Sequence, residues 1–186
     1  MTNNNGFSLI EILTTIAIAG VIASMAIPSC RTTIEKNKVQ KERDELASHF
    51  RLARSTAITK SGTTVICASD DTSTCSQSGD WTDGWIVFIN NDADLTAYDS
   101  STDLLLKVSD GIDGEHSLLW SDGGSEVVFE SSGEVSHSGT FTFCGNSANA
   151  RRSRALIVYP TGSFRPSIDV DRNGVPEGLG GVELTC

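Results

Sequence analysis

The chain of 186 residues predicts an α+β fold in which one long N-terminal helix packs against antiparallel β-structure. Residues 7–27 form an apolar run, and apolar positions recur at helical spacing over the next thirty residues. The rest of the chain alternates short apolar runs with turn residues, as strands do. This length suits one ordinary domain with a buried core. The sequence has no internal repeat and no interdomain linker, so the helix and the strands should share one core.

The first apolar run is long enough to cross a membrane. It reads FSLIEILTTIAIAGVIASMAI, and as a helix it would extend about 32 Å, the thickness of a bilayer core. Its single charge is Glu11, and a charge at that depth costs at least about 2.5 kcal/mol unless a partner neutralises it. We therefore expect Glu11 to have a partner. A secretory signal peptide fits less well, because the leader has no Lys or Arg and Glu11 interrupts the apolar region.

Residues 6–11, which read Gly-Phe-Ser-Leu-Ile-Glu, resemble the GF(T/S)LxE processing site of type IV prepilins. The resemblance implies that a prepilin peptidase cuts after Gly6 and methylates Phe7. It also implies that Glu11 pairs with the N-terminal amine of a neighbouring subunit during assembly. Pro28 matches the helix-kinking proline of pilins. The chain then divides into a leader (1–6), a transmembrane and assembly half-helix (7–28), and a globular domain (29–186) that includes the amphipathic half of the helix.

A second, amphipathic helical segment follows Pro28. Leu46, Phe50, Ala53 and Ala57 recur at steps of three or four, while charged residues fill the positions between them. The pattern predicts a helix that ends near residues 61–62. Joined to the first run it makes about 50 residues, near 80 Å, with a kink at Pro28 because proline removes a backbone hydrogen bond. We expect the second half to pack on the domain and the first half to be buried by a membrane or by like helices.

The remaining sequence predicts an antiparallel sheet or a small sandwich. Seven short apolar runs are separated by Asp-Gly, Asp-Gly-Gly, Ser-Ser-Gly and Pro-Thr-Gly, which favour turns. The predicted strands are Thr63–Ala68, Gly84–Ile89, Leu104–Val108, Ser117–Trp120, Glu126–Phe129, Thr140–Phe143 and Ala155–Tyr159.

Five cysteines in a domain that would be exported suggest disulfides. Cys67 and Cys75 flank a polar loop, and Cys144 could reach Cys186, although other pairings stay open. On the loop-closure model these two bridges would contribute about 2.5 and 4 kcal/mol. Cys30 is left over at the membrane edge, where we expect a free packing residue.

A second resemblance covers nearly the whole chain. Cys67 and Cys75, followed by Trp81-x-x-Gly84-Trp85-Ile-Val-Phe88, are similar to the CxSxD…C, W-x-x-GW-(I/V)-V-F signature of the GspH/FimT/FimU minor pilins and pseudopilins. Residues 140–144 and 151–166 also look like the C-terminal half of that family. The resemblance implies a type IV pilin-like fold. Trp81, Trp85 and Phe88 are expected to be aromatic core residues.

Charge is unevenly distributed along the chain. Residues 61–150 carry fifteen Asp or Glu against one Lys, and four of the nine arginines fall close together later. Guanidinium groups suit phosphate, and some FimT-type minor pilins bind DNA through a C-terminal G-R-x-R motif. The nearest match here is residues 162–165, which read Gly-Ser-Phe-Arg, so that of the two arginines of the motif only the second, Arg165, is present. The clustered arginines are Arg151, Arg152, Arg154 and Arg165. They could contact DNA, or they could pair with acidic groups of the domain or with neighbouring subunits, and both interpretations stay open.

Residues 169–174 fit the front half of a calcium loop, because oxygen ligands alternate and a glycine permits the sharp turn. Glycine stands where the loop would end in Glu, although Glu177 could contribute. Calcium binding and an ordinary surface turn both remain open, and we expect no other cofactor. The candidate ligands are Asp169, Asp171, Asn173 and Glu177.

The sequence lacks G-x-S-x-G, H-E-x-x-H, C-x-x-C and a phosphate-binding glycine loop, so we expect no enzyme. The resemblances imply a minor pilin that helps to initiate a type IV pilus serving twitching motility, adhesion or DNA uptake. Its partners would be other minor and major pilins, the prepilin peptidase and the inner membrane, with DNA as a further candidate partner. It would cross the inner membrane once, with a periplasmic domain, and become extracellular in the pilus. A DNA-binding minor pilin of natural transformation and a type II secretion pseudopilin are the alternatives.

Overall fold

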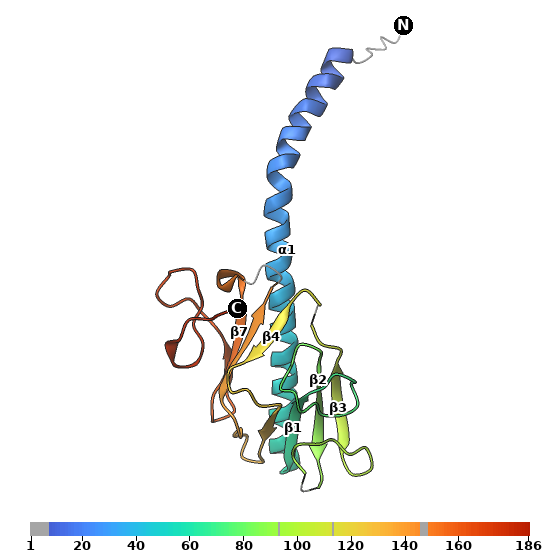
Figure 1. The fold of residues 1–186 in the computed structure, drawn as a ribbon, viewed down its shortest axis with the longest axis vertical. Coiled ribbons are helices and arrows are strands. Elements are labelled where there is room, and N and C mark those ends of the chain that lie inside the picture. Colours follow the sequence, from blue (N-terminus) through green and yellow to red (C-terminus); the bar gives the residue numbers. More distant parts are fainter. Residues whose placement is uncertain (1–7, 93, 113, 146–148) are drawn as a thin grey trace. The chain divides into compact units, whose positions relative to one another are not determined.

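The computed structural model describes residues 8–92, 94–112, 114–145 and 149–186, without the side chains of residues 25–32. Its contacts divide the chain into two compact units, residues 1–37 and 38–186. The order of the elements confirms the predicted α+β fold (Figure 1). The elements are α1 (Leu9–Lys60), β1 (Thr63–Ala68), β2 (Trp85–Asn90), β3 (Leu104–Ser109), β4 (Ser117–Trp120), β5 (Glu126–Phe129), β6 (Gly139–Cys144), η1 (Ala150–Arg152), β7 (Arg154–Val158), β8 (Phe164–Pro166) and η2 (Leu179–Gly181).

The long predicted helix is present as α1. The carbonyl oxygen of Ser8 accepts from the backbone N–H groups of Glu11 and Ile12 at 3.1 and 3.2 Å and so begins the helix. Pro28 lies within the bounds of α1, and the kink expected there remains a prediction. In the part of the chain that the structure describes, no helix has a stretch both long and apolar enough to cross a membrane. Phe7 and the side chains of residues 25–27, which belong to the predicted span, lie outside that part.

The C-terminal part of α1 belongs to the second unit and presents a buried apolar stripe. Leu46, Phe50, Ala53 and Ala57 are all fully buried, as their helical spacing predicts. The helix ends where predicted, because Ser61 adopts a left-handed conformation and the N–H of Gly62 bonds back to the carbonyl of Ala57 at 3.1 Å.

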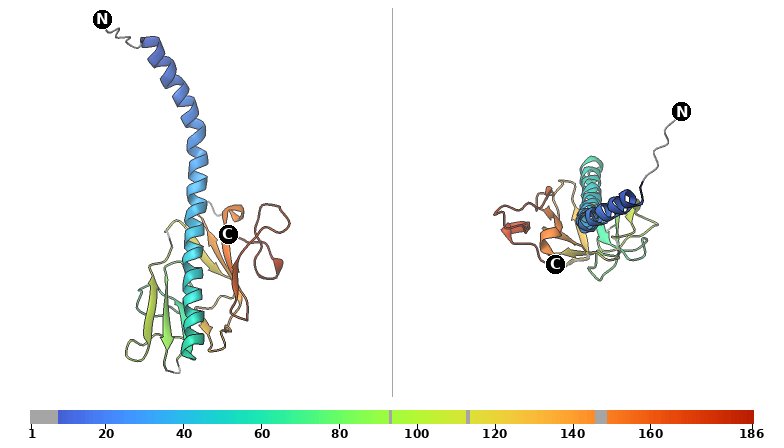
Figure 2. Two further views of the ribbon diagram at one scale, coloured as in Figure 1. Left: turned by 180° about the vertical axis from the view of Figure 1, so that it is seen from behind. Right: turned by 90° about the horizontal axis from the view of Figure 1, so that it is seen from above.

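The strands form two four-stranded antiparallel sheets, ordered β3-β2-β1-β5 and β4-β6-β7-β8. Both lie along the C-terminal part of α1 (Figures 1 and 2). All seven predicted strands are present within one or two residues of their expected bounds. The sequence missed β8, since three residues that end in proline carry no alternating pattern.

The core lies between α1 and the inner faces of both sheets. Phe50 on α1 meets the rings of Phe129, Phe141 and Phe164 edge-on at 5.5, 5.6 and 5.8 Å between centroids. Trp81, Trp85 and Phe88 are fully buried, as expected from the sequence. Phe88 belongs to a smaller cluster on the outer face of the first sheet.

Two disulfides close the long loops. Cys67 pairs with Cys75, and Cys144 pairs with Cys186, which is the pairing favoured from the sequence. The first holds the loop after β1 against the smaller apolar cluster, because both Cys67 and Cys75 belong to it. The second ties the end of the chain to the end of β6.

Candidate functional site

The processing motif lies at the start of the chain, and its residues Gly6 and Phe7 fall outside the described part of the structure. Glu11 is described and lies in the first turn of α1, where it is exposed to solvent. A carboxylate there faces the positive end of the helix dipole. It is the one charged residue between Ser8 and Ser24. Its neighbours are large, exposed apolar side chains: Leu9, Ile10, Ile12 and Leu13.

Residues 9–24 of α1 carry large apolar side chains on every side of the helix. Large side chains that cover all faces of the helix stay about half or more exposed: Leu9, Ile10, Ile12, Leu13, Ile16, Ile18, Val21 and Ile22. The hydroxyls of Thr14, Thr15 and Ser24 donate to carbonyls three residues earlier at 2.7–3.0 Å, so they are satisfied without water. A helix that is apolar all round is usually buried in a membrane or among other helices.

The sheet separates two of the four clustered arginines. Arg154 begins β7 on the same face as Leu156, which belongs to the core beside α1. Burial, followed by the nearby charge of Arg43, lowers the pKa of Arg154. Arg165 lies opposite Ile157 in the strand register and so points from the other face. The arginines therefore do not form a single basic face.

Arg165 and Arg151 lie beside other groups of the domain. Arg165 donates from Nε to the hydroxyl of Tyr159 at 2.7 Å, and its guanidinium carbon lies 5.8 Å from the centre of that ring. Arg151 lies in η1 with Arg152, and one of its guanidinium nitrogens is 3.3 Å from where a side chain on Gly174 would begin. Arg151 thus rests against the loop of the candidate calcium ligands.

That loop brings three of its four candidate ligands together. Carboxylate oxygens of Asp169, Asp171 and Glu177 all lie within 4.8 Å of one another. Glu177 is nearly buried and accepts from the N–H of Val170 at 2.9 Å. One oxygen of Asp169 accepts from the N–H of Gly174 at 2.8 Å, and the other is buried and has no hydrogen-bond partner among the residues that the structure describes.

The amide of Asn173 is already engaged, since it donates to Asp171 at 2.9 Å and to Glu183 at 2.6 Å. The sequence spacing had not pointed to Glu183, because it comes from beyond the loop. Oxygen ligands of this kind suit a hard cation such as calcium, whose binding here stays a prediction.

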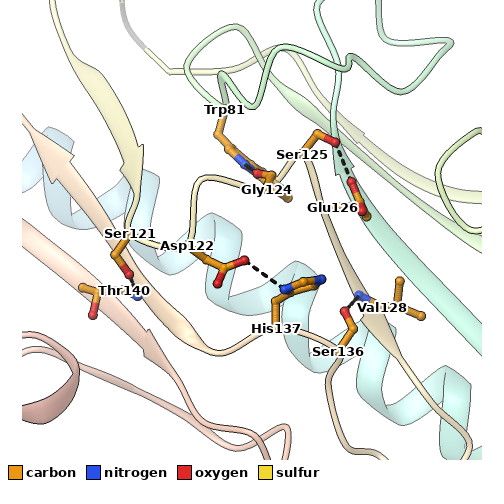
Figure 3. Close-up of polar contacts among 10 residues, drawn as sticks. All are labelled: Trp81, Ser121, Asp122, Gly124, Ser125, Glu126, Val128, Ser136, His137 and Thr140. Carbon is orange, nitrogen blue, oxygen red and sulfur yellow. Dashed lines mark hydrogen bonds and ion pairs between the residues drawn. The ribbon is translucent and has the colours of Figure 1, made fainter.

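A network of polar contacts ties the turn between β4 and β5 to the segment before β6 (Figure 3). Asp122 pairs with His137 at 2.9 Å between Oδ2 and Nδ1, and Trp81 donates from Nε1 to the carbonyl of Gly124 at 3.0 Å. The hydroxyl of Ser121 accepts from the N–H of Thr140 at 2.9 Å. These contacts satisfy polar groups around the core, which is a structural role.

The other two histidines connect α1 to the sheets. Nδ1 of His49 accepts a hydrogen bond of 2.8 Å from Nε1 of Trp85. His116 lies 2.8 Å from a carboxylate oxygen of Glu42, and both side chains are largely buried. The sequence predicted surface or satisfied histidines, and these two are satisfied.

Comparison with known proteins places the chain in a family. The family model of the type II transport protein GspH matches residues 42–162, and that of the prokaryotic N-terminal methylation motif matches residues 1–27. No curated protein is significantly similar to the chain in sequence.

Two crystal structures of the type IV minor pilin FimU from Pseudomonas aeruginosa share its fold. One is 19% identical over 69% of this chain and 92% of that chain, with a TM-score of 0.54. The other is 21% identical over 70% of this chain and 89% of that chain, with a TM-score of 0.56. Because the GspH model covers more than half of its length, the chain belongs to the GspH family, and it has the type IV pilin-like fold.

Proposed function

We propose that the chain is a minor pilin that is first anchored in the inner membrane and is then incorporated into a type IV pilus. The prepilin peptidase would cut after Gly6 and methylate Phe7, as the match to the methylation motif supports. The observation that carries the proposal is the exposed, mostly apolar surface of residues 9–24, with Glu11 as its one charge. Such a surface needs apolar surroundings, which a bilayer and the centre of a helical filament both supply.

Assembly then needs an interaction whose free energy depends on where each subunit sits relative to its neighbours. Moving the apolar side chains from lipid to the helices of a filament changes little free energy, because both surroundings are apolar. Glu11 behaves differently, since its charge costs at least about 2.5 kcal/mol in a bilayer core without a partner. Pairing with the N-terminal amine of an adjacent subunit removes that cost and fixes the register between them.

The globular domain would face outward and select its neighbours among other minor and major pilins. Initiation of the pilus, and through it twitching motility, adhesion or DNA uptake, would follow from this incorporation. We assign the domain to assembly rather than to direct DNA capture, because β7 and β8 place Arg154 and Arg165 on opposite faces.

A pseudopilin of type II secretion is the second candidate, favoured by the match to the GspH model. It would use the same processing site, the same charge pairing and the same apolar helix. The two candidates differ in the apparatus that they complete. Deletion of the gene should abolish pili in the first case and secretion of exported proteins in the second.

Replacement of the residue before the cut tests the proposal. Gly6→Ala should leave the unprocessed precursor in the membrane and remove the protein from sheared pili, both measured by immunoblotting in cells that express the peptidase. Gly20→Ala is the matched control, because an added Cβ there meets no atom within 4 Å. Normal processing of Gly6→Ala would contradict the proposed cleavage.

A further inference from the structure

A cleft lies on the outer face of the second sheet, beside the C-terminal segment of the chain. It has a volume of about 340 Å³, which is within the usual range of ligand pockets, and all of its lining residues belong to the second compact unit. β6 and the turn after β4 form its floor, and residues 178–185 form its wall. No sequence motif had pointed to it, because floor and wall are far apart along the chain.

The wall of the cleft is attached to the floor at two points. The hydroxyl of Thr140 accepts from the backbone N–H of Leu179 at 2.8 Å. The disulfide between Cys144 and Cys186 ties the end of the chain to the end of β6. Leu184, which lies between these two points along the chain, is only 5% exposed. The cleft is therefore formed by hydrogen bonds, packing and a covalent bond of the domain itself.

Thr142 on the floor of the cleft has a buried hydroxyl that the fold leaves unused. In β6, Phe141 and Phe143 belong to the core, so Thr142 points from the opposite, outer face. Thr142 is 7% exposed and lines the cleft, and its hydroxyl forms no hydrogen bond with the residues that the structure describes. Because buried polar groups are nearly always hydrogen-bonded, this hydroxyl indicates a partner bound in the cleft.

The lining of the cleft combines hydroxyl groups with an apolar patch. The hydroxyls belong to Ser121, Ser138, Thr140, Thr142 and Thr185. The apolar patch consists of Leu179, Val182 and Leu184. None of the described residues that line the cleft is Lys or Arg, whereas Asp122 and Glu183 are acidic. The cleft therefore disfavours an anion.

The two carboxylates of the cleft are oriented by donors that lie outside it. Oδ2 of Asp122 pairs with Nδ1 of His137 at 2.9 Å, as Figure 3 shows. Oε1 of Glu183 accepts from Nδ2 of Asn173 at 2.6 Å. The second oxygen of each carboxylate accepts nothing from the described residues. Since each carboxylate already has one donor, the cleft suits neutral O–H donors better than a full positive charge.

We propose that the cleft binds a neutral saccharide, with a hexose or N-acetylhexosamine ring against Leu179 and Val182. A sugar ring carries hydroxyls that both donate and accept around its rim, together with apolar C–H faces, and so matches both parts of the lining. Thr142 would bond to one sugar hydroxyl at the floor, and Asp122 and Glu183 would accept from others. The inference goes beyond assembly, because it gives the outward-facing domain a ligand.

Titration of the full chain in detergent with three disaccharides tests the proposal. The probes are maltose, lactose and the disaccharide of N-acetylglucosamine, and saturation-transfer NMR measures the binding of each. At least one should bind saturably, and comparison of the three distinguishes a hexose from an N-acetylhexosamine ligand. Glucuronate, an anion, and cadaverine, a diamine, should bind more weakly than that sugar.

Removal of one hydroxyl tests the role of Thr142. Thr142→Val keeps the shape of the side chain and loses a hydrogen bond to the sugar, so it should weaken binding about fivefold. Thr64→Val is the matched control, because Thr64 is 1% exposed and its hydroxyl is also buried without a partner among the described residues. Thr64 lies in β1, in the other sheet, so this variant should bind as the wild type does.

A second variant blocks the cleft from its exposed side. Val182 and Val170 are both 68% exposed, so neither side chain is needed for the core, but only Val182 lines the cleft. Val182→Trp should abolish binding of the sugar, whereas Val170→Trp should leave it unchanged.

Three results would each overturn the proposal. None of the three disaccharides binds saturably, Thr142→Val binds as tightly as Thr64→Val, or glucuronate or cadaverine binds more tightly than every sugar. The assay uses the purified chain and requires no pilus, so its failure leaves the proposed function standing. Failure of processing in the Gly6→Ala experiment, in turn, has no bearing on the cleft.

Discussion

At the scale of single residues, Glu11 combines an ionised side chain with surroundings that are otherwise apolar. Leu9, Ile10, Ile12 and Leu13 enclose it along the chain and stay exposed in the isolated subunit. A carboxylate is costly in such surroundings once they are buried, so its presence needs a compensating positive charge. The N-terminal amine produced by cleavage after Gly6 is the group that the proposed mechanism supplies.

Glu11→Val should therefore separate processing from assembly. The peptidase should still cut the precursor, because the residues at the cut are unchanged, whereas recovery in sheared pili should fall at least about tenfold since the charge pairing is lost. Immunoblots of membranes and sheared pili measure both. Glu11→Asp, which keeps the charge, is the control and should assemble better than Glu11→Val. Undiminished incorporation of Glu11→Val would mean that the carboxylate has another role.

His49 predicts how stability depends on pH. Burial lowers the pKa of His49 from its ordinary value of 6.5, against the raising effect of Glu45 and together with the lowering effect of Lys107. The unfolded chain then binds the proton more tightly than the folded protein does. The stabilisation is fully present above pH 6.5 and is lost as the pH falls below that value. Protonation of Nδ1 would also break the hydrogen bond from Trp85.

Urea unfolding at pH 7.5 and 5.5, followed by tryptophan fluorescence, checks this expectation. The wild-type chain should be less stable at the lower pH. His49→Gln offers a hydrogen-bond acceptor that does not titrate, so this variant should show a smaller difference between the two pH values. An equal difference in both proteins would contradict the role assigned to His49.

At the scale of elements, two turns meet at a pair of glycines. Gly162 has a positive φ of 69°, and a Cβ on it would lie 1.8 Å from the carbonyl oxygen of Gly133. Arg54 bonds to that carbonyl and to the carbonyl of Thr161, so α1 holds both turns. Gly162 is the first residue of the segment that resembles a DNA-binding motif. The close contact with Gly133 leaves no room for a side chain at this position, which explains the glycine by packing.

Gly162→Ala should destabilise the domain by about 2 kcal/mol or more, because the backbone must shift to relieve the contact. Gly123→Ala is the matched control, since its φ is 78° and nothing lies within 4 Å of an added Cβ. That variant should lose only about 1 kcal/mol for the backbone conformation. Urea unfolding of both variants measures the difference, and equal losses would contradict the close approach of the two turns.

At the scale of the whole molecule, charge argues against a general affinity for DNA. The net charge is −10 at pH 7, and residues 61–150 carry fifteen acidic residues against Lys107 alone. Two of the four clustered arginines, Arg154 and Arg165, lie on opposite faces of a sheet. A polyanion therefore meets no continuous basic surface among these four arginines.

We expect the full chain in detergent to show no salt-sensitive binding to double-stranded DNA at about 0.15 M salt. Fluorescence anisotropy at several salt concentrations measures this. The comparison is a variant with Arg151, Arg152, Arg154 and Arg165 all changed to Ala. Binding that weakens with salt and disappears in the variant would reverse the expectation and move the function towards DNA capture.

The sequence by itself determined the long helix and seven of the eight strands, and it favoured the two cysteine pairs without settling them. These features are encoded locally, by the spacing of apolar residues, by turn residues between strands and by cysteines that flank loops. Leu46, Phe50 and Ala53 marked the buried face of α1 for that reason. The motif at residues 6–11 was equally local, although Gly6 and Phe7 lie outside the described structure.

Only the tertiary structure decided which distant residues share a surface. Arg154 and Arg165 are close in sequence, but the register of β7 and β8 places them on opposite faces. Arg51 and Phe164 are far apart in sequence, yet α1 and β8 bring them into one groove. Strand order and register depend on contacts between residues far apart along the chain, which no local pattern of spacing contains.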